Sequence, residues 1–285
     1  PMNLFSRTSF FCLAPALALL TACGSGASPE SPESSMPGAP DEAIRMIGGE
    51  LEAGNGGILW QAMPDSYQED VTAIAQLAGS KVDAELYDKS FALISRLAEV
   101  MDQQKDFILN SPFLAEQPEA KVAELQAAWP SVIGFVKTLF ESPLGSAEGL
   151  QNFQGQAFFD ESLAGLLGYA REMNALSDVD FSTEFGEVEL LKNADQSAIL
   201  QFTVEGEEPQ IQRFSLVENR WVPAEIAEQW DASIQAAKAQ LEAVTLEEIE
   251  KNKPQMLGAI TMFEGVLTQI EAAGTQEEFN RAMQG

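Results

Sequence analysis

The hydrophobic pattern changes its period near residue 180, and this change restricts the possible folds more than any other feature of the chain. Over 86–109, apolar residues recur at helical spacing. Over 188–222, apolar and polar residues alternate, which is the period of half-buried β-strands. After residue 224 the helical spacing returns. The sequence therefore predicts an α+β fold, mainly a helical bundle, with a small three- to four-stranded antiparallel meander and C-terminal helices.

Prolines and turn residues mark the expected ends of elements. The stretch Glu218-Asn219-Arg220 is typical of a tight turn between strands, since asparagine tolerates the left-handed backbone conformation. Pro130 is expected to separate a helix over 119–128 from one over 131–141, because a proline inside a helix removes a backbone hydrogen bond. Pro254 is expected to interrupt the C-terminal helices in the same way.

An apolar run of about eleven residues precedes Leu20-Thr21-Ala22-Cys23. The run is too short to span a membrane, which needs roughly 20 residues, and it fits the hydrophobic part of an export signal. The four residues resemble the lipobox of bacterial lipoproteins. This resemblance implies cleavage before Cys23, acylation of that cysteine with fatty acids such as palmitate, and anchoring in a membrane. An ordinary export signal with a chance cysteine is the alternative.

Gly24 follows the cysteine at the position where aspartate favours retention in the inner membrane in lipoproteins of this type. The lipobox resemblance therefore implies a bacterial cell envelope location, in the outer membrane rather than the inner membrane.

The composition along the chain predicts five segments. Pro-Glu-Ser repeats after Cys23 offer too little apolar surface for a core, and glycines continue up to Gly57, so a flexible tether is expected there. The expected segments are 1–22, a signal peptide; 23–57, the lipidated cysteine and the tether; 58–180, a helical region; 181–223, the β-meander; and 224–285, helices that pack on the sheet.

The chain is strongly acidic, with 44 Asp and Glu against 16 Lys and Arg and a net charge of −28. A nucleic-acid partner is disfavoured, because phosphate contacts require a basic surface. Direct attraction to anionic lipid is disfavoured for the same reason, so the lipid on Cys23 is the expected link to the membrane. Solubility is the simplest explanation of the acidic surface, and a cationic partner is the alternative.

The sequence contains no histidine, which excludes several catalytic classes. Ser-His-Asp and Cys-His mechanisms and HExxH zinc sites all require that residue. The only cysteines are Cys12, inside the expected signal, and Cys23. We therefore assign no catalytic residue and no cofactor, and we expect the chain not to be an enzyme. A hydrolase with paired carboxylates is the alternative, since its two acids can come from any part of a chain.

One acidic stretch has the spacing of a calcium-binding loop. Positions 1, 3, 5, 7 and 12 of such a loop are occupied by Asp178, Asp180, Ser182, Glu184 and Glu189. Thr183 stands where the loop needs glycine, and a strand pattern follows in place of the second helix. The stretch therefore fits a helix-to-strand connection with solvated carboxylates better than a metal site.

Aromatic residues are the candidates for contact with a partner. Most occur at the spacing of core residues, but Trp60 lies beside the glycine-rich segment, and we take Trp60 and Tyr67 as partner-binding candidates. Residues 60–109 also resemble exported bacterial proteins of unknown function, and the strand ending in ENRWVP resembles the closing strand of small exported α+β domains. Neither resemblance implies an activity.

These features together predict a membrane-anchored envelope lipoprotein that is a non-catalytic binding or structural module. Its expected partner is an envelope protein or a glycan, bound through an apolar or aromatic patch with acids around the rim. Two alternatives stay open: a small-ligand-binding lipoprotein with a pocket between sheet and helices, and a carboxylate-pair hydrolase.

Overall fold

The computed structural model describes residues 36–174, 186–204, 206 and 208–284. The chain divides into two compact units. The sheet unit comprises the described residues of 1–78, 151–167 and 181–244, and the helical unit comprises those of 79–150, 168–180 and 245–285. Each unit is therefore assembled from separate stretches of the sequence rather than from the consecutive segments that composition predicts.

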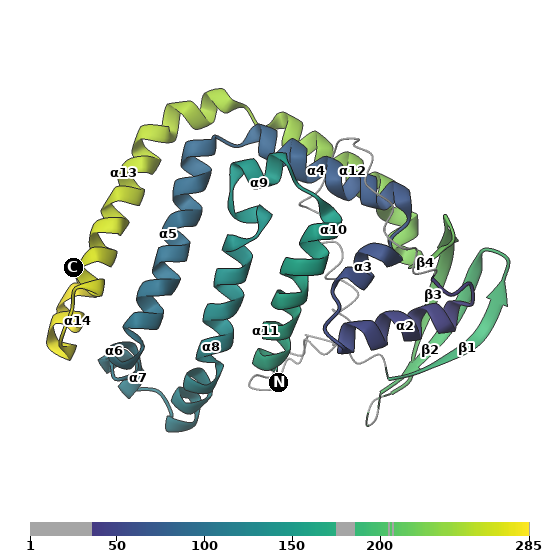
Figure 1. Ribbon diagram of the computed structural model, residues 1–285, viewed down its shortest axis with the longest axis horizontal. Helices are drawn as coiled ribbons and strands as arrows, with labels where there is room; N and C mark the ends of the chain where they lie inside the picture. Colours follow the sequence, from purple (N-terminus) through teal and green to yellow (C-terminus); the bar gives the residue numbers. More distant parts are fainter. Residues whose placement is uncertain (1–35, 175–185, 205, 207, 285) are drawn as a thin grey trace, which may run out of the picture. The chain divides into compact units, whose positions relative to one another are not determined.

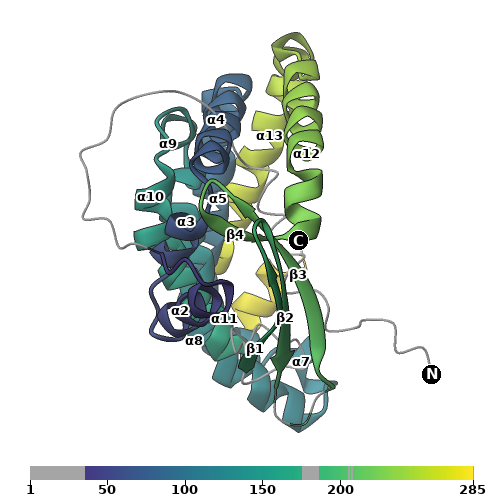
Figure 2. The same ribbon diagram turned by 90° about the vertical axis from the view of Figure 1, so that its right-hand side faces the viewer.

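Four antiparallel strands form one sheet in the order β1-β2-β3-β4 (Figures 1 and 2). The strands are β1 (Glu187–Ala194), β2 (Ser197–Thr203), β3 (Gln210–Val217) and β4 (Arg220–Pro223). The predicted α+β fold with an antiparallel meander is thus confirmed. Between β3 and β4 the φ angles of Glu218 and Asn219 are 47° and 62°, so both residues adopt the left-handed conformation that a tight hairpin turn requires.

A helix from the expected tether packs on the sheet. This helix, α2 (Pro40–Glu52), contacts β1, β2 and β4. The buried cluster that joins α2 to the strands contains Ala43, Ile44, Ile47, Leu51, Val188, Ala198, Leu200, Phe202, Phe214 and Trp221. Two hydrogen bonds add to it: Trp221 Nε1 donates to the Gly38 carbonyl oxygen at 2.9 Å, and Arg45 Nη2 donates to the Val188 carbonyl oxygen at 2.8 Å.

The expectation of a tether over 23–57 is therefore wrong from Pro40 onward. Gly48 and Gly49 lie inside α2, where each glycine costs about 1 kcal/mol relative to alanine. Burial of one large aliphatic side chain contributes about 1.5–3 kcal/mol, and α2 buries Ile44, Ile47 and Leu51. Apolar burial against the sheet thus outweighs the glycines, which sequence composition alone does not reveal.

Further helices complete the sheet unit. They are α3 (Gly57–Ala62), α4 (Asp65–Lys81, whose last turn belongs to the helical unit), α10 (Gly155–Ala157), the π-helix η2 (Phe158–Leu163) and α12 (Ala224–Ala243). α12 packs on β3 and β4. Ile234 and Ala237 of α12 form a buried cluster with Ala73 and Ile74 of α4.

The helical unit contains a row of three long helices in which α5 lies between α13 and α8 (Figure 1). Its elements are α5 (Ala84–Gln103), α6 (Lys105–Leu109), α7 (Pro112–Ala115), α8 (Glu119–Glu141), η1 (Pro143–Gly145), α13 (Leu246–Glu271) and α14 (Gln276–Ala282), with parts of α9 (Ala147–Gln151) and α11 (Ala164–Asn174). The expectation that all helices of 224–285 pack on the sheet holds for α12 only. α13 and α14 belong to the helical unit, where α13 packs on α5 and α14 packs on α13.

Both internal prolines lie inside continuous helices, Pro130 in α8 and Pro254 in α13. The expected helix breaks at these prolines are therefore wrong. A proline inside a helix costs about 3 kcal/mol, but Trp129, Ser131 and Ile133 are buried around Pro130, and their packing holds the helix together. The single helix expected over 86–109 instead divides at Gln104, whose buried side chain donates to the Glu271 carbonyl oxygen at 2.9 Å.

Candidate interaction surface

The two aromatic residues expected to contact a partner are both buried. Trp60 and Tyr67 each have an exposed fraction of 7%. The Trp60 ring packs on Phe159 with 5.2 Å between ring centroids, and it also packs against Gly155, where a β-carbon would overlap the indole. The Tyr67 ring stacks on Trp230 of α12 at 3.9 Å. The expectation that these rings face a partner is therefore corrected, because both pack between helices of the sheet unit.

Hydrogen bonds to the Asp70 carboxylate lie beside the stacked rings of Tyr67 and Trp230. Asp70 accepts hydrogen bonds from Trp230 Nε1 at 3.1 Å and from Lys238 Nζ at 2.9 Å. Burial raises the pKa of the Tyr67 hydroxyl, and the nearby carboxylates Asp231, Glu218 and Asp70 raise it further. A phenol with a raised pKa keeps its proton at neutral pH, so this cluster supplies packing and not an activated nucleophile.

Most of the other sequence candidates lie outside the described residues. These are Cys23 and four of the five calcium-loop positions, Asp178, Asp180, Ser182 and Glu184. The fifth, Glu189, is an exposed residue of β1. Within the part of the chain that the structure describes, no group of three or more Asp, Glu, His or Cys side chains is arranged to hold a metal ion.

A hollow beside the sheet gives little support to a small-ligand site. It lies between α2 and the β3–β4 turn, and Ile47, Arg220 and Trp221 are among the residues that line it. Its enclosed volume is about 10 Å³, whereas small-molecule sites usually enclose roughly 300–1,000 Å³.

Among the residues that the structure describes, three carboxyl groups have a lowered pKa. Hydrogen bonds from Lys253 lower the pKa of Asp83 and of Glu85, and the backbone N–H of Ser66 lowers that of Glu218. A general acid of a paired-carboxylate hydrolase needs a raised pKa, because it must carry a proton at the working pH. These three groups therefore lack the raised pKa that the general acid of such a hydrolase requires.

The exposed side of α13 carries large apolar side chains and no charge over residues 254–263. Met256, Met262 and Phe263 have exposed fractions of 45%, 63% and 55%. Residues 254–263 contain no charged side chain, although the whole chain carries 44 acidic residues. Large apolar side chains that are exposed together on one surface often mark contact sites. We call Met256, Ala259, Met262 and Phe263 the α13 patch.

Helical geometry extends this apolar surface onto α5. Arg96 of α5 donates to Thr268 at 2.9 Å and to Glu271 at 2.8 Å, so these side chains mark one face of the α5–α13 pair. At about 100° per residue, Ile94 lies about 160° round α5 from Arg96, and Phe263 lies about 140° round α13 from Thr268. Both residues therefore lie on the opposite face of the pair. Ile94 and Leu97 of α5 are 36% and 41% exposed there.

α14 covers the C-terminal end of the same apolar stripe. Residues 256, 259, 263, 266 and 270 of α13 follow one another in steps of three and four, which is the spacing of a helix-packing seam. Val266 and Ile270 of this series belong to a buried cluster with Phe279 and Ala282 of α14. The stripe is thus covered by a helix over 266–270 and exposed over 256–263.

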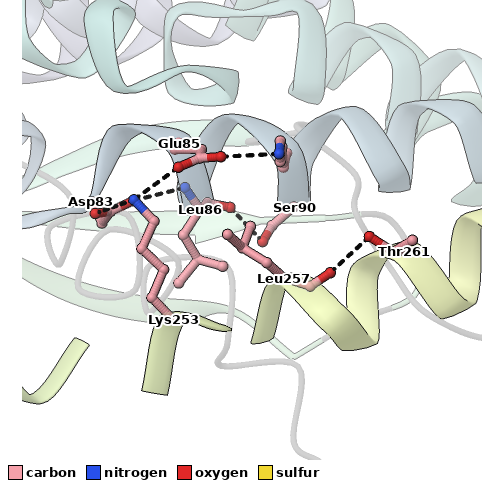
Figure 3. A network of polar contacts seen from close by, with 8 residues as sticks. Asp83, Glu85, Leu86, Ser90, Lys253, Leu257 and Thr261 are labelled. Atoms are coloured by element: carbon pink, nitrogen blue, oxygen red, sulfur yellow. Dashed lines mark hydrogen bonds and ion pairs between the residues drawn. The ribbon is translucent and has the colours of Figure 1, made fainter. Parts of the chain in front are cut away.

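Ion pairs at the other end of α13 fix its position on α5 (Figure 3). Lys253 Nζ lies 2.9 Å from Asp83 and 3.0 Å from Glu85, and both carboxylates raise the pKa of the lysine. Asp83 also accepts a hydrogen bond from the Leu86 N–H at 2.9 Å, which caps the start of α5. The α13 patch is therefore carried by a helix that is held at both ends.

Sequence reasoning missed the α13 patch, although a signal was present. The uncharged run 254–263 within an acidic chain is visible in the sequence. A helix with two apolar stripes does not reveal which stripe is buried, however, because periodicity reports spacing and not the neighbour that each stripe meets.

No family model matches the chain, and neither the curated proteins nor the solved structures include a match. In the part of the chain described here, no helix combines the length and the apolar character that crossing a membrane would need.

Proposed function

We propose that this chain is a lipid-anchored module of the bacterial cell envelope, at the outer membrane, that binds another macromolecule and does not catalyse a reaction. The observation that carries the binding role is the α13 patch, a charge-free apolar surface in an otherwise acidic protein. The lipobox-like Leu20-Thr21-Ala22-Cys23 supports the anchor.

The composition of the surface around the patch supports a contact site. Exposed neutral side chains, Gln255 and Gln269, border the apolar residues on α13. An apolar centre with a polar rim is the usual arrangement of a protein–protein interface. The residues that flank the patch on α13 are thus polar and uncharged.

The anchor is tested by changing Cys23 to alanine in the full chain. The unchanged protein should fractionate with membranes at the mass of a cleaved, acylated chain, whereas Cys23→Ala should be uncleaved or released. Cys12→Ala is the matched control and should behave as the unchanged protein, because Cys12 lies in the expected signal. Recovery of Cys23→Ala in membranes at the mature mass would contradict the anchor.

The binding role is tested by photocrosslinking in intact cells. A photoreactive amino acid at Phe263 should give a crosslinked product, because the patch is then in contact with a partner. The same amino acid at Thr261, which is exposed on another side of α13, is the control and should give little product. Absence of any product from Phe263 would count against the binding role.

The non-catalytic role is tested by activity assays. Turnover of an ester, peptide, glycoside or phosphate substrate that is abolished by substitution of one Asp or Glu would contradict this role.

A further inference from the structure

We infer that the partner of the α13 patch is a second copy of this chain, so that the protein forms a symmetric dimer in which two α13 helices pack antiparallel. The inference rests on the proposed function, because it names the macromolecule that the same surface binds. Two observations carry it: the distribution of charge and the self-complementary spacing of the patch.

The charge distribution favours a second copy at this surface. Two chains that each carry a net charge of −28 repel one another, and close contact between acidic faces would strengthen that repulsion. The uncharged run 254–263 avoids acid-to-acid contact when it faces the same run of another copy. The patch of one copy can therefore pack on the identical patch of another without bringing acidic residues together. A basic partner would find no acidic residue in the patch to attract it.

The spacing of the patch is self-complementary. In an antiparallel pair with its two-fold axis beside Ala259, Met256 of one copy faces Phe263 of the other, and the small Ala259 side chains lie at the axis. α14 follows Phe263 in the chain and covers the stripe only over 266–270. The two α14 helices of such a dimer therefore lie at opposite ends of the helix pair, and they leave its centre free.

The expected dimer is weak and depends on salt. One helix pair with Ile94 and Leu97 beside it buries less than the roughly 800 Å² per partner of a standard interface. Repulsion between the acidic chains opposes association and is screened as salt rises, with a Debye length of about 10 Å at 0.1 M. Association should therefore strengthen several-fold between low and moderate NaCl, whereas binding to a basic partner would weaken.

Disulfide crosslinking of the full chain tests the geometry. With Cys12 and Cys23 changed to serine, Ala259→Cys supplies the only thiol, and mild oxidation should give a disulfide-linked dimer as the main product. Thr261→Cys is the matched control, because Thr261 is exposed on another side of the same helix. Equal crosslinking of both variants, or none with Ala259→Cys, would overturn the inference.

Charge substitutions test the register in the same background. Phe263→Glu should reduce dimer formation at least about 100-fold in sedimentation velocity, because it places a carboxylate from each copy in the interface. Adding Met256→Lys to Phe263→Glu should restore much of the dimer, since the new lysine of one copy faces the new glutamate of the other. Circular dichroism checks that both variants fold, and Met262→Glu replaces Phe263→Glu if that variant does not. Lack of rescue in folded protein would overturn the register.

Failure of this inference can be separated from failure of the proposed function. A monomer at every salt concentration, together with a photocrosslink from Phe263 to a different protein, would overturn the dimer and leave the binding role intact. Absence of both the dimer and any photocrosslink would overturn the inference and count against the binding role.

Discussion

Lys253 Nζ lies 2.9 Å from Asp83 Oδ1, the same oxygen that accepts the Leu86 N–H at the start of α5. One carboxylate thus caps α5 and pairs with a lysine of α13, 170 residues away in the sequence. The pair couples the local stability of a helix end to the contact between two helices (Figure 3).

Asp83→Asn should lower stability at neutral pH and have less effect in acid. The hydrogen bond from Lys253, with that from the Leu86 N–H, lowers the pKa of Asp83, so the ionised form contributes stability above its unfolded pKa of about 3.9. This contribution is lost as pH falls through the lower folded pKa. Asparagine keeps the cap but loses the ion pair, so the difference from the unchanged protein in urea unfolding should shrink below about pH 4. A pH-independent difference would contradict this account.

Gly155→Ala should destabilise the sheet unit. Its β-carbon would overlap the buried Trp60 ring, and overpacking of a core typically costs about 1–3 kcal/mol of the free energy of unfolding. Gly49→Ala is the matched control in the same unit, because a β-carbon there meets nothing within 4 Å. The control should raise stability by up to about 1 kcal/mol. Urea unfolding of both variants measures the two effects, and equal effects would argue against the contact with Trp60.

The Tyr87 hydroxyl should lose its proton at a higher pH than an ordinary tyrosine does. Burial, followed by the nearby Asp88 carboxylate, raises the pKa of Tyr87 to about 12, and its hydroxyl donates to the Leu144 carbonyl oxygen at 2.6 Å. Because the folded state holds this proton more tightly than the unfolded state, the contribution to stability is complete below about pH 10 and is lost as pH rises toward 12. Tyrosinate absorbance should show late-titrating tyrosines, and Tyr87→Phe should remove one of them while Tyr67 remains. An unchanged titration in that variant would refute the assignment.

Moderate salt should raise the melting temperature by a few degrees. A folded chain with a net charge of −28 repels itself, and salt screens this repulsion. The measurement is made on Phe263→Glu, so that association of copies does not contribute. Salt would also weaken surface ion pairs such as Arg96–Glu271, so a falling melting temperature would show that such pairs dominate.

The sequence alone determined the fold class and the sheet. Alternation over 188–222 is a local property, and it identified the strands and the turn at Asn219 before any long-range contact was known. The sequence also shows directly that the chain has no histidine and that a lipobox-like stretch ends at Cys23.

Only the tertiary structure decided which apolar residues are covered and by what. Trp60 is buried because Gly155, nearly a hundred residues away, leaves room for its ring, and residues 40–52 are helical because the sheet buries their apolar side. Met262 and Phe263 are exposed because α14 covers α13 only farther along, at Val266 and Ile270. Local periodicity sets the element that a segment forms, whereas burial depends on contacts between residues far apart in the chain, which that periodicity does not encode.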